Sequence, residues 1–298
     1  MSFLSFLGLH PVVTSRLAGV IGFTYAYQAL FASYAVPNKT EKYYDLAGST
    51  GFITSTILSL YYPTVRSWFT SSPQALNFSL GAHHPRQLLV SAMMLLWAGR
   101  LGTYLFQRIM RDGSDSRFDD LKTRPLIFTG MWFGQALWVT LVGLPAYLVN
   151  SVPAAAHPAL GLKDLIGVSI WAAGLGLEII ADREKSAWRA AKNDKKHEEK
   201  FISSGVWAWS RHPNYLGEVI LQSGPPLLAL TAPLPPTVKY LACISPFFSY
   251  VLLRYGSGVP PLEESAEKKW GKDEGWKKYR DQTSVLVPWP AGLGKGKA

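Results

Sequence analysis

The chain has 298 residues, of which 48% are hydrophobic and 13% aromatic, and its formal net charge is +10 at pH 7. Length alone would allow two soluble domains, but this composition is typical of membrane proteins. The single cysteine, Cys243, excludes an intramolecular disulfide and a metal site made of several cysteines.

Seven mostly apolar runs follow one another along the chain. Most approach the roughly 20 residues needed to cross about 30 Å of hydrocarbon, and they lack the alternation of barrel strands. The runs are Leu17–Val36, Leu46–Tyr62, Leu88–Phe106, Leu126–Val149, Leu162–Ala181, Leu216–Leu230 and Val238–Leu253. We predict an all-α polytopic membrane helix bundle of about seven transmembrane helices. The last two should form a helical hairpin around the proline-rich segment Thr231–Thr237.

The predicted bundle has no linker of the soluble type and no internal repeat that we can identify. We therefore expect one membrane-embedded domain over residues 1–298, with a flexible tail at 290–298. No basic residue precedes Arg16, and no clear cleavage site follows the first apolar run. A removable signal peptide is therefore not expected.

Basic residues predict the orientation of the bundle. Of the 30 lysines and arginines, 23 lie in four segments: 2 (Lys39, Lys42) after the first run, 5 in Arg108–Arg124, 8 in Arg183–Arg211 and 8 after Gly256. Seven crossings place all four segments on one side, which the positive-inside rule makes cytoplasmic. We expect a lumenal N-terminus and a cytoplasmic C-terminus. Because these residues flank spans, we expect anionic headgroups and a phosphorylated cofactor as ligands, and no nucleic acid.

The segment Ser210-Arg-His-Pro-Asn-Tyr-Leu-Gly-Glu218 joins a charged stretch to an apolar run. Pro213 suits a first helical turn, so a helix should begin near His212 with its free N–H groups available to an anion. Asn214 and Glu218 stand four apart, as do Arg211 and Tyr215, while Gly217 leaves room for a ligand or a neighbouring backbone. The alternative is structural: Arg211 and His212 anchor the helix at the headgroups, with Asn214 as its cap.

Further polar residues lie within or just after the apolar runs. Arg100 is a functional candidate because ionisable residues are rare inside spans, although it could also pair structurally. Asp182 and Arg189 follow the fifth run, where a structural pairing of carboxylate and cation is the alternative. We regard Lys192–Lys200 as a solvated charged face. His83 and His84 have no cysteine or carboxylate companions, so we predict no metal site.

Together these residues resemble the steroid 5-alpha-reductase-like superfamily. The run Arg211–Glu218, preceded by Phe201–Trp209 and followed by a further span, looks like the C-terminal domain of that superfamily. The closest resemblance is to an uncharacterised branch, and sterol reductases and isoprenylcysteine carboxyl methyltransferases are more distant. The resemblance covers roughly residues 88–289, and the branch pattern is echoed by Trp97–Arg100, Asp182–Ser186, Gly258–Glu263 and Val287–Trp289.

The resemblance implies a reductase in the endoplasmic-reticulum membrane that uses NADPH from the cytoplasm. Its substrate would be a steroid or other lipid, taken from the bilayer, with an activated carbon–carbon double bond; no protein partner is inferred. We therefore name as catalytic candidates Asn214, which matches the nicotinamide-side asparagine, Tyr215 and Glu218. The cofactor-binding candidates are Arg100, Asp182, Arg183, Lys185, Arg189, Arg211, His212, Arg254 and Glu263.

Two departures from the superfamily pattern leave alternatives open. Glu263 stands where steroid reductases have histidines, and the proton donor is unassigned among Tyr25, Tyr27, Tyr43 and Tyr44. A methyltransferase using S-adenosylmethionine would share the Arg-His-Pro-x-Tyr run and a later glutamate. The basic residues upstream favour NADPH, because a sulfonium cofactor carries no phosphate. A third possibility is a lipid-binding membrane protein without enzymatic activity.

Overall fold

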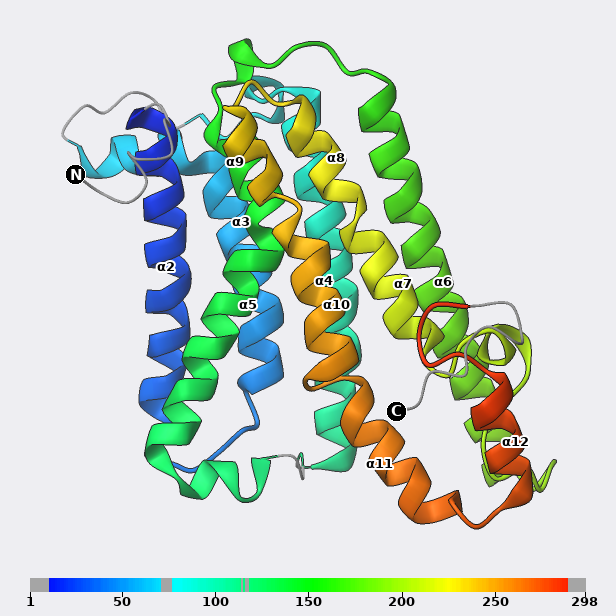
Figure 1. The fold of residues 1–298 in the computed structure, drawn as a ribbon. Helices are drawn as coiled ribbons and strands as arrows, with labels where there is room; N and C mark the ends of the chain where they lie inside the picture. Colours follow the sequence, from blue (N-terminus) through cyan, green and yellow to red (C-terminus); the bar gives the residue numbers. More distant parts are fainter. Residues whose placement is uncertain (1–10, 71–76, 114, 116–117, 289–298) are drawn as a thin grey trace. The chain divides into compact units, whose positions relative to one another are not determined.

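The computed structural model describes residues 11–70, 77–113, 115 and 118–288 (Figure 1). These residues form α-helices and short 3-10 turns, and no strand is present among them apart from an isolated bridge between Ser210 and Ser284. The predicted all-α fold is thus confirmed. The longer helices are α2 (Pro11–Ala35), α3 (Tyr44–Phe69), α4 (Pro85–Asp112), α5 (Pro125–Ser151) and α6 (Leu162–Asn193). The shorter ones are α7 (Pro213–Gln222), α8 (Gly224–Thr231), α9 (Pro236–Leu241), α10 (Ile244–Tyr255), α11 (Val259–Trp270) and α12 (Glu274–Gln282).

Four helical stretches in the described part of the chain are long and apolar enough to cross a bilayer. They are Pro85–Met110, Pro125–Ser151, Leu162–Asn193 and Pro236–Trp270, and they cover the third, fourth, fifth and seventh predicted spans. These four fit an integral membrane protein. The first two predicted spans lie on α2 and α3, and the sixth lies on α7 and α8. The predicted tail at 290–298 lies outside the described residues.

The helices group into two compact units. The first contains Met1–Val168 and Pro225–Ser245, and the second contains Ser169–Gly224 and Pro246–Ala298. Each unit takes segments from two parts of the sequence, so no single linker separates them. The single domain expected from the sequence stays a prediction.

In the first unit, helices α2, α3, α4 and α5 pack against one another (Figure 1). Buried amides and hydroxyls join them: Gln135 donates to Gln28 over 2.9 Å, and Asn150 donates to Ser59 over 2.8 Å. Such bonds explain why polar residues interrupt the apolar runs, since helices in a membrane associate through close packing and interhelical hydrogen bonds. The chain then turns back between α8 and α9, as expected for the hairpin (Figure 1).

The two ends of the first unit are each fixed by polar contacts. At one end, Glu41 accepts from the Lys122 ammonium over 3.1 Å and from the Asp115 backbone N–H over 3.2 Å. The basic segments after the first and third predicted spans therefore lie at the same end, as the charge pattern predicts. At the other, Arg86 forms a bidentate pair with Asp164 over 2.7 and 2.9 Å.

In the second unit, α6 and α7 cross at two glycines. A Cβ atom added to Gly174 would lie 2.3 Å from the Leu221 backbone nitrogen, and one added to Gly217 would lie 2.8 Å from the Glu178 nitrogen. Gly217 thus makes room for a neighbouring backbone, one of the two uses expected for it. Beyond the apolar run that ends at Ala181, α6 continues as a charged helix to Asn193.

Candidate functional site

The second unit encloses a cavity of about 400 Å³. One wall is the charged end of α6, and α11 and α12 contribute others. The remaining lining comes from the segment between α6 and α7, which includes Phe201 and Trp207, and from Arg211 and His212 just before α7. The cavity is therefore formed by the parts of the chain that follow the predicted fifth and seventh spans, where basic residues are concentrated.

Arg211 holds the cavity wall together. Its guanidinium donates to both carboxylate oxygens of Glu263 over 3.2 and 2.8 Å. The Nη1 atom donates to the carbonyl oxygens of Arg280 and Thr283, the latter over 3.0 Å, and the Arg211 backbone N–H donates to Ser284 over 2.9 Å. One side chain thus joins α11 to the end of α12 beside the start of α7.

His212 is the second partner of Glu263. Its Nε2 atom lies 2.7 Å from the Glu263 carboxylate, and its ring stacks on Tyr215 with centroids 5.7 Å apart. Burial lowers the pKa of His212, while the hydrogen bond to Glu263 acts in the opposite direction. The imidazole, the guanidinium and the carboxylate therefore form one polar cluster at the cavity wall.

Aromatic side chains form the apolar part of the cavity lining. Phe201 contacts Trp270, Trp276 and Tyr279, with ring centroids between 5.2 and 5.7 Å apart. The Tyr279 hydroxyl donates to the Trp207 carbonyl oxygen over 2.7 Å, and burial raises the pKa of this phenol, so that it stays a donor. Flat apolar faces of this kind can stack on planar ring systems.

The charge of the lining is strongly positive. Lysines and arginines contribute six of its residues, whereas Glu263 is the single carboxylate among the described lining residues. The six are Lys185, Arg189, Lys192, Lys200, Arg211 and Lys269. Arg211 neutralises much of the Glu263 charge, so the remaining cations define the potential of the cavity. An anionic ligand suits this arrangement better than a cationic one.

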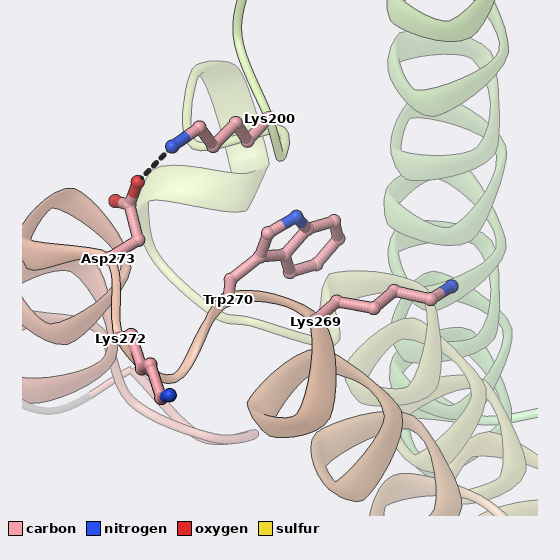
Figure 2. A pocket seen from close by; sticks show the side chains of 5 residues that line it. All are labelled: Lys200, Lys269, Trp270, Lys272 and Asp273. Carbon is pink, nitrogen blue, oxygen red and sulfur yellow. Dashed lines mark hydrogen bonds and ion pairs between the residues drawn. The ribbon is translucent and has the colours of Figure 1, made fainter.

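A more open hollow of about 470 Å³ adjoins the cavity and shares Lys200, Lys269 and Trp270 with it. Figure 2 shows the Trp270 indole among the side chains that line this hollow, with the ion pair between Lys200 and Asp273 beside it. Lys272 and Asp273 line only this hollow, since neither is part of the inner cavity.

Of the predicted site residues, five line the cavity: Lys185, Arg189, Arg211, His212 and Glu263. Asp182 and Arg183 lie on α6 and Arg254 on α10 of the same unit, outside the lining. Arg100 lies on α4 in the first unit. The structure thus brings five of the nine cofactor-binding candidates together in one cavity.

The catalytic candidates occupy the first two turns of α7. The helix begins as predicted, with His212 at the N-cap and Pro213 at its first position. Asn214 is therefore inside the first turn, and the alternative in which it caps the helix is wrong. Glu218 accepts from the Gln222 amide over 3.1 Å, and the carbonyl oxygen of the buried Gln222 meets no donor among the described residues. This face of α7 retains an available acceptor.

The sequence reasoning missed several lining residues. Trp270, Trp276 and Tyr279 lie in the segment after the last apolar run, which resembles a polar tail because lysines surround them. The segment Lys192–Lys200 is mostly exposed, as predicted, and its two end residues also line the cavity. The useful signal was the spacing of large aromatic residues in an otherwise charged stretch, since such residues rarely stay exposed without a role.

A family model described as a protein of unknown function, DUF1295, matches residues 35–283. The chain belongs to this family. The family is of the steroid 5-alpha-reductase-like kind, so the resemblance seen in the motifs is confirmed at that level, and the match begins further towards the N-terminus than those motifs do. Neither the curated proteins nor the solved structures compared with the chain gave a match.

Proposed function

We propose that this protein is a membrane-bound reductase that transfers a hydride from NADPH to an activated carbon–carbon double bond of a steroid or other lipid. The observation that carries the proposal is the cavity of the second unit, with six cationic side chains and an aromatic wall. The phosphates of a dinucleotide suit the cations, and its planar rings suit the indole faces.

Bound NADPH would supply the hydride, and the chain's own residues would position the reactants. The family resemblance assigns the nicotinamide end to Asn214 on α7, where Gln222 leaves a buried acceptor on the face of Glu218. Arg189 and Lys185 would hold the phosphates. The apolar helices would exclude water while a side chain protonates the substrate carbon or oxygen that becomes negative.

The proposed setting is the endoplasmic-reticulum membrane, with a lumenal N-terminus and a cytoplasmic C-terminus. The one-sided distribution of lysine and arginine supports this orientation. The cofactor would then reach its cavity from the cytoplasm, and the lipid substrate would enter from the bilayer. The proposal involves no nucleic acid and no protein partner.

A methyltransferase is the second candidate, and the cluster around Glu263 favours it. A carboxylate close to aromatic faces is a setting in which a sulfonium cation could bind. Both Glu263 oxygens, however, already accept from Arg211, and five further cations line the same cavity. The charge balance therefore supports the reductase over the methyltransferase. A lipid-binding protein without activity is the third candidate.

Thermal stabilisation of the purified protein in detergent distinguishes these candidates. A ligand that binds only the folded state raises the melting temperature, and the increase grows with the ratio of its free concentration to its Kd. We expect NADPH to raise it more than NADH or S-adenosylmethionine at equal concentration. Selective stabilisation by S-adenosylmethionine would transfer the assignment to methyl transfer, and no effect of any cofactor would support the lipid-binding alternative.

A further inference from the structure

The hollow around Trp270 is a separate feature from the polar cluster of Arg211, His212 and Glu263. It is lined by three lysines, one indole and one carboxylate, and it shares Lys200, Lys269 and Trp270 with the cavity. The hollow and the cavity are therefore neighbours in the second unit that share part of their lining.

The carboxylate of the hollow has defined partners in the fold. Asp273 is the N-cap of α12 and accepts from the Trp276 backbone N–H over 3.0 Å, and it also holds the Lys200 ammonium. Lys269 and Lys272 form no ion pair with a carboxylate of the described residues. Their charge is consequently available to a ligand, and the hollow has a net positive charge of two from its three lysines and one carboxylate.

The indole of Trp270 packs against two other aromatic rings. Its ring contacts Phe201 and Trp276, with centroids 5.7 and 5.6 Å apart. Figure 2 shows the ring between the paired Lys200 and Asp273 and the separate Lys269. A planar base that stacks on such a ring gains binding energy at little cost in side-chain entropy, because neighbouring rings already fix the indole.

We propose that this hollow binds the adenosine-phosphate end of a nucleotide, with the base stacked on Trp270 and its phosphates paired with Lys269 and Lys272. The inference rests on the proposed function, because it assigns the outer end of the NADPH molecule whose nicotinamide end is assigned to Asn214. The inference adds to the proposed function by naming residues of α11 and the following turn as those that make the protein bind NADPH in preference to NADH. The extra phosphate of NADPH is the group that we expect these lysines to bind.

Adenosine 2′,5′-bisphosphate is the direct probe, because it contains the base and two phosphates but no nicotinamide. In detergent at low ionic strength it should raise the melting temperature of the wild-type protein, while adenosine should do so only at much higher concentration. Trp270→Leu should raise the concentration required about tenfold, and Trp270→Phe should restore most of the effect. Lys269→Met and Lys272→Met should weaken binding, and more salt should reduce their difference from wild type.

Lys278→Met is the matched control, since Lys278 is an exposed lysine of α12 outside both the hollow and the cavity. It should leave the effect of the probe unchanged. Equal stabilisation by inorganic pyrophosphate would overturn the stacking on Trp270. Stabilisation by vesicles of anionic lipid, and not by the nucleotide, would show that the hollow binds headgroup phosphate and would overturn the proposal.

The two proposals fail in different ways. If NADPH stabilises wild type, Trp270→Leu, Lys269→Met and Lys272→Met equally, the hollow is not part of the nucleotide site, although the reductase proposal stands. If S-adenosylmethionine stabilises the protein and NADPH does not, the proposed function is lost. Unliganded melting temperatures of each variant show that it is folded before its ligand response is compared.

Discussion

The contacts of Arg211 change what its removal should do. In a purely cofactor-binding role, Arg211→Ala would affect the liganded protein only. Here the guanidinium bonds to Glu263 and to the carbonyl oxygens of Arg280 and Thr283, so its loss leaves several buried or half-buried acceptors without a donor. We expect Arg211→Ala to lower the free energy of unfolding without ligand by about 1–3 kcal/mol. A melting temperature equal to that of wild type would contradict a stabilising role for these Arg211 contacts.

Asn214 allows a sharper test, because it is the second residue of α7 and the cap is His212. Alanine is a good helix former, so Asn214→Ala should change the free energy of unfolding by no more than roughly 0.5 kcal/mol. If the amide orients the nicotinamide, however, cofactor-dependent turnover should fall on the order of 10²-fold. Asn193→Ala, at the exposed end of α6, is the control and should leave turnover unchanged. Full turnover of Asn214→Ala would remove α7 from the mechanism.

At the scale of elements, the sequence predicts where a helix begins more readily than it predicts which distant residues contact each other. The start of α7 follows from Pro213, because proline lacks an N–H that the first turn would not use. The clamp of Arg211 could not be foreseen, since its partners at Arg280 and Thr283 are backbone carbonyls, which every residue carries. Beyond the apolar run that ends at Ala181, α6 continues to Asn193, because a helix outside the hydrocarbon needs no apolar pattern.

The crossing of α6 and α7 depends on the absence of two side chains. A Cβ atom at Gly174 would lie 2.3 Å from the Leu221 backbone nitrogen, and backbone cannot rotate away as a flexible side chain can. Gly174→Ala should therefore separate the helices and cost about 1–3 kcal/mol. Gly176→Ala is the matched control on the same helix. Nothing lies within 4 Å of its added Cβ, so it should be neutral or stabilising by up to about 1 kcal/mol. Melting temperatures that fell equally in both variants would show a general intolerance of α6.

One end of the first unit should be sensitive to acid. The His157 Nδ1 atom lies 3.4 Å from Arg86 Nη1, a donor, and Nε2 lies 3.2 Å from the Val149 carbonyl oxygen, so a neutral ring protonated at Nε2 fits both contacts. His84 Nδ1 accepts from the Arg86 backbone N–H, and its ring stacks on His157 at 5.1 Å. Protonating either ring at Nδ1 removes a hydrogen bond and adds a positive charge beside Arg86. Asp164 is already committed to the guanidinium through both oxygens.

Burial lowers the pKa of His157 to about 4, with His84 and Arg86 acting in the same direction. Because the folded pKa lies below the unfolded value of about 6.5, this contribution to stability is complete above pH 6.5 and is lost as the pH falls towards 4. His157→Gln should flatten the melting temperature over that interval relative to wild type. The lowered pKa of His212 has the same sign but is present in both proteins, so it cancels in the difference. Parallel pH curves for the two proteins would contradict the assignment.

At the scale of the molecule, α6 is the element that both units share. Its first residues belong to the first unit, where Asp164 meets Arg86, and its charged end forms a wall of the cavity in the second. An apolar stretch suited to a bilayer lies between them. The arrangement fits two different demands on one helix. Its middle is suited to lipid, and its charged end would hold the anionic ligand proposed above.

This role of α6 predicts on which side of the membrane three loops lie. With Cys243→Ser as background, single cysteines at Thr123, Ala155 and Ser203 would each occupy an exposed position outside the candidate spans. If α5 and α6 both cross, a membrane-impermeant thiol reagent added to sealed microsomes should label Thr123→Cys and Ser203→Cys. Ala155→Cys should react only after the membrane is permeabilised. The basic residues of Arg108–Arg124 and Arg183–Arg211 predict that Thr123 and Ser203 lie on the cytoplasmic side. Labelling of all three without permeabilisation would mean that neither helix crosses, and the cavity would then have no assigned side from which to receive NADPH.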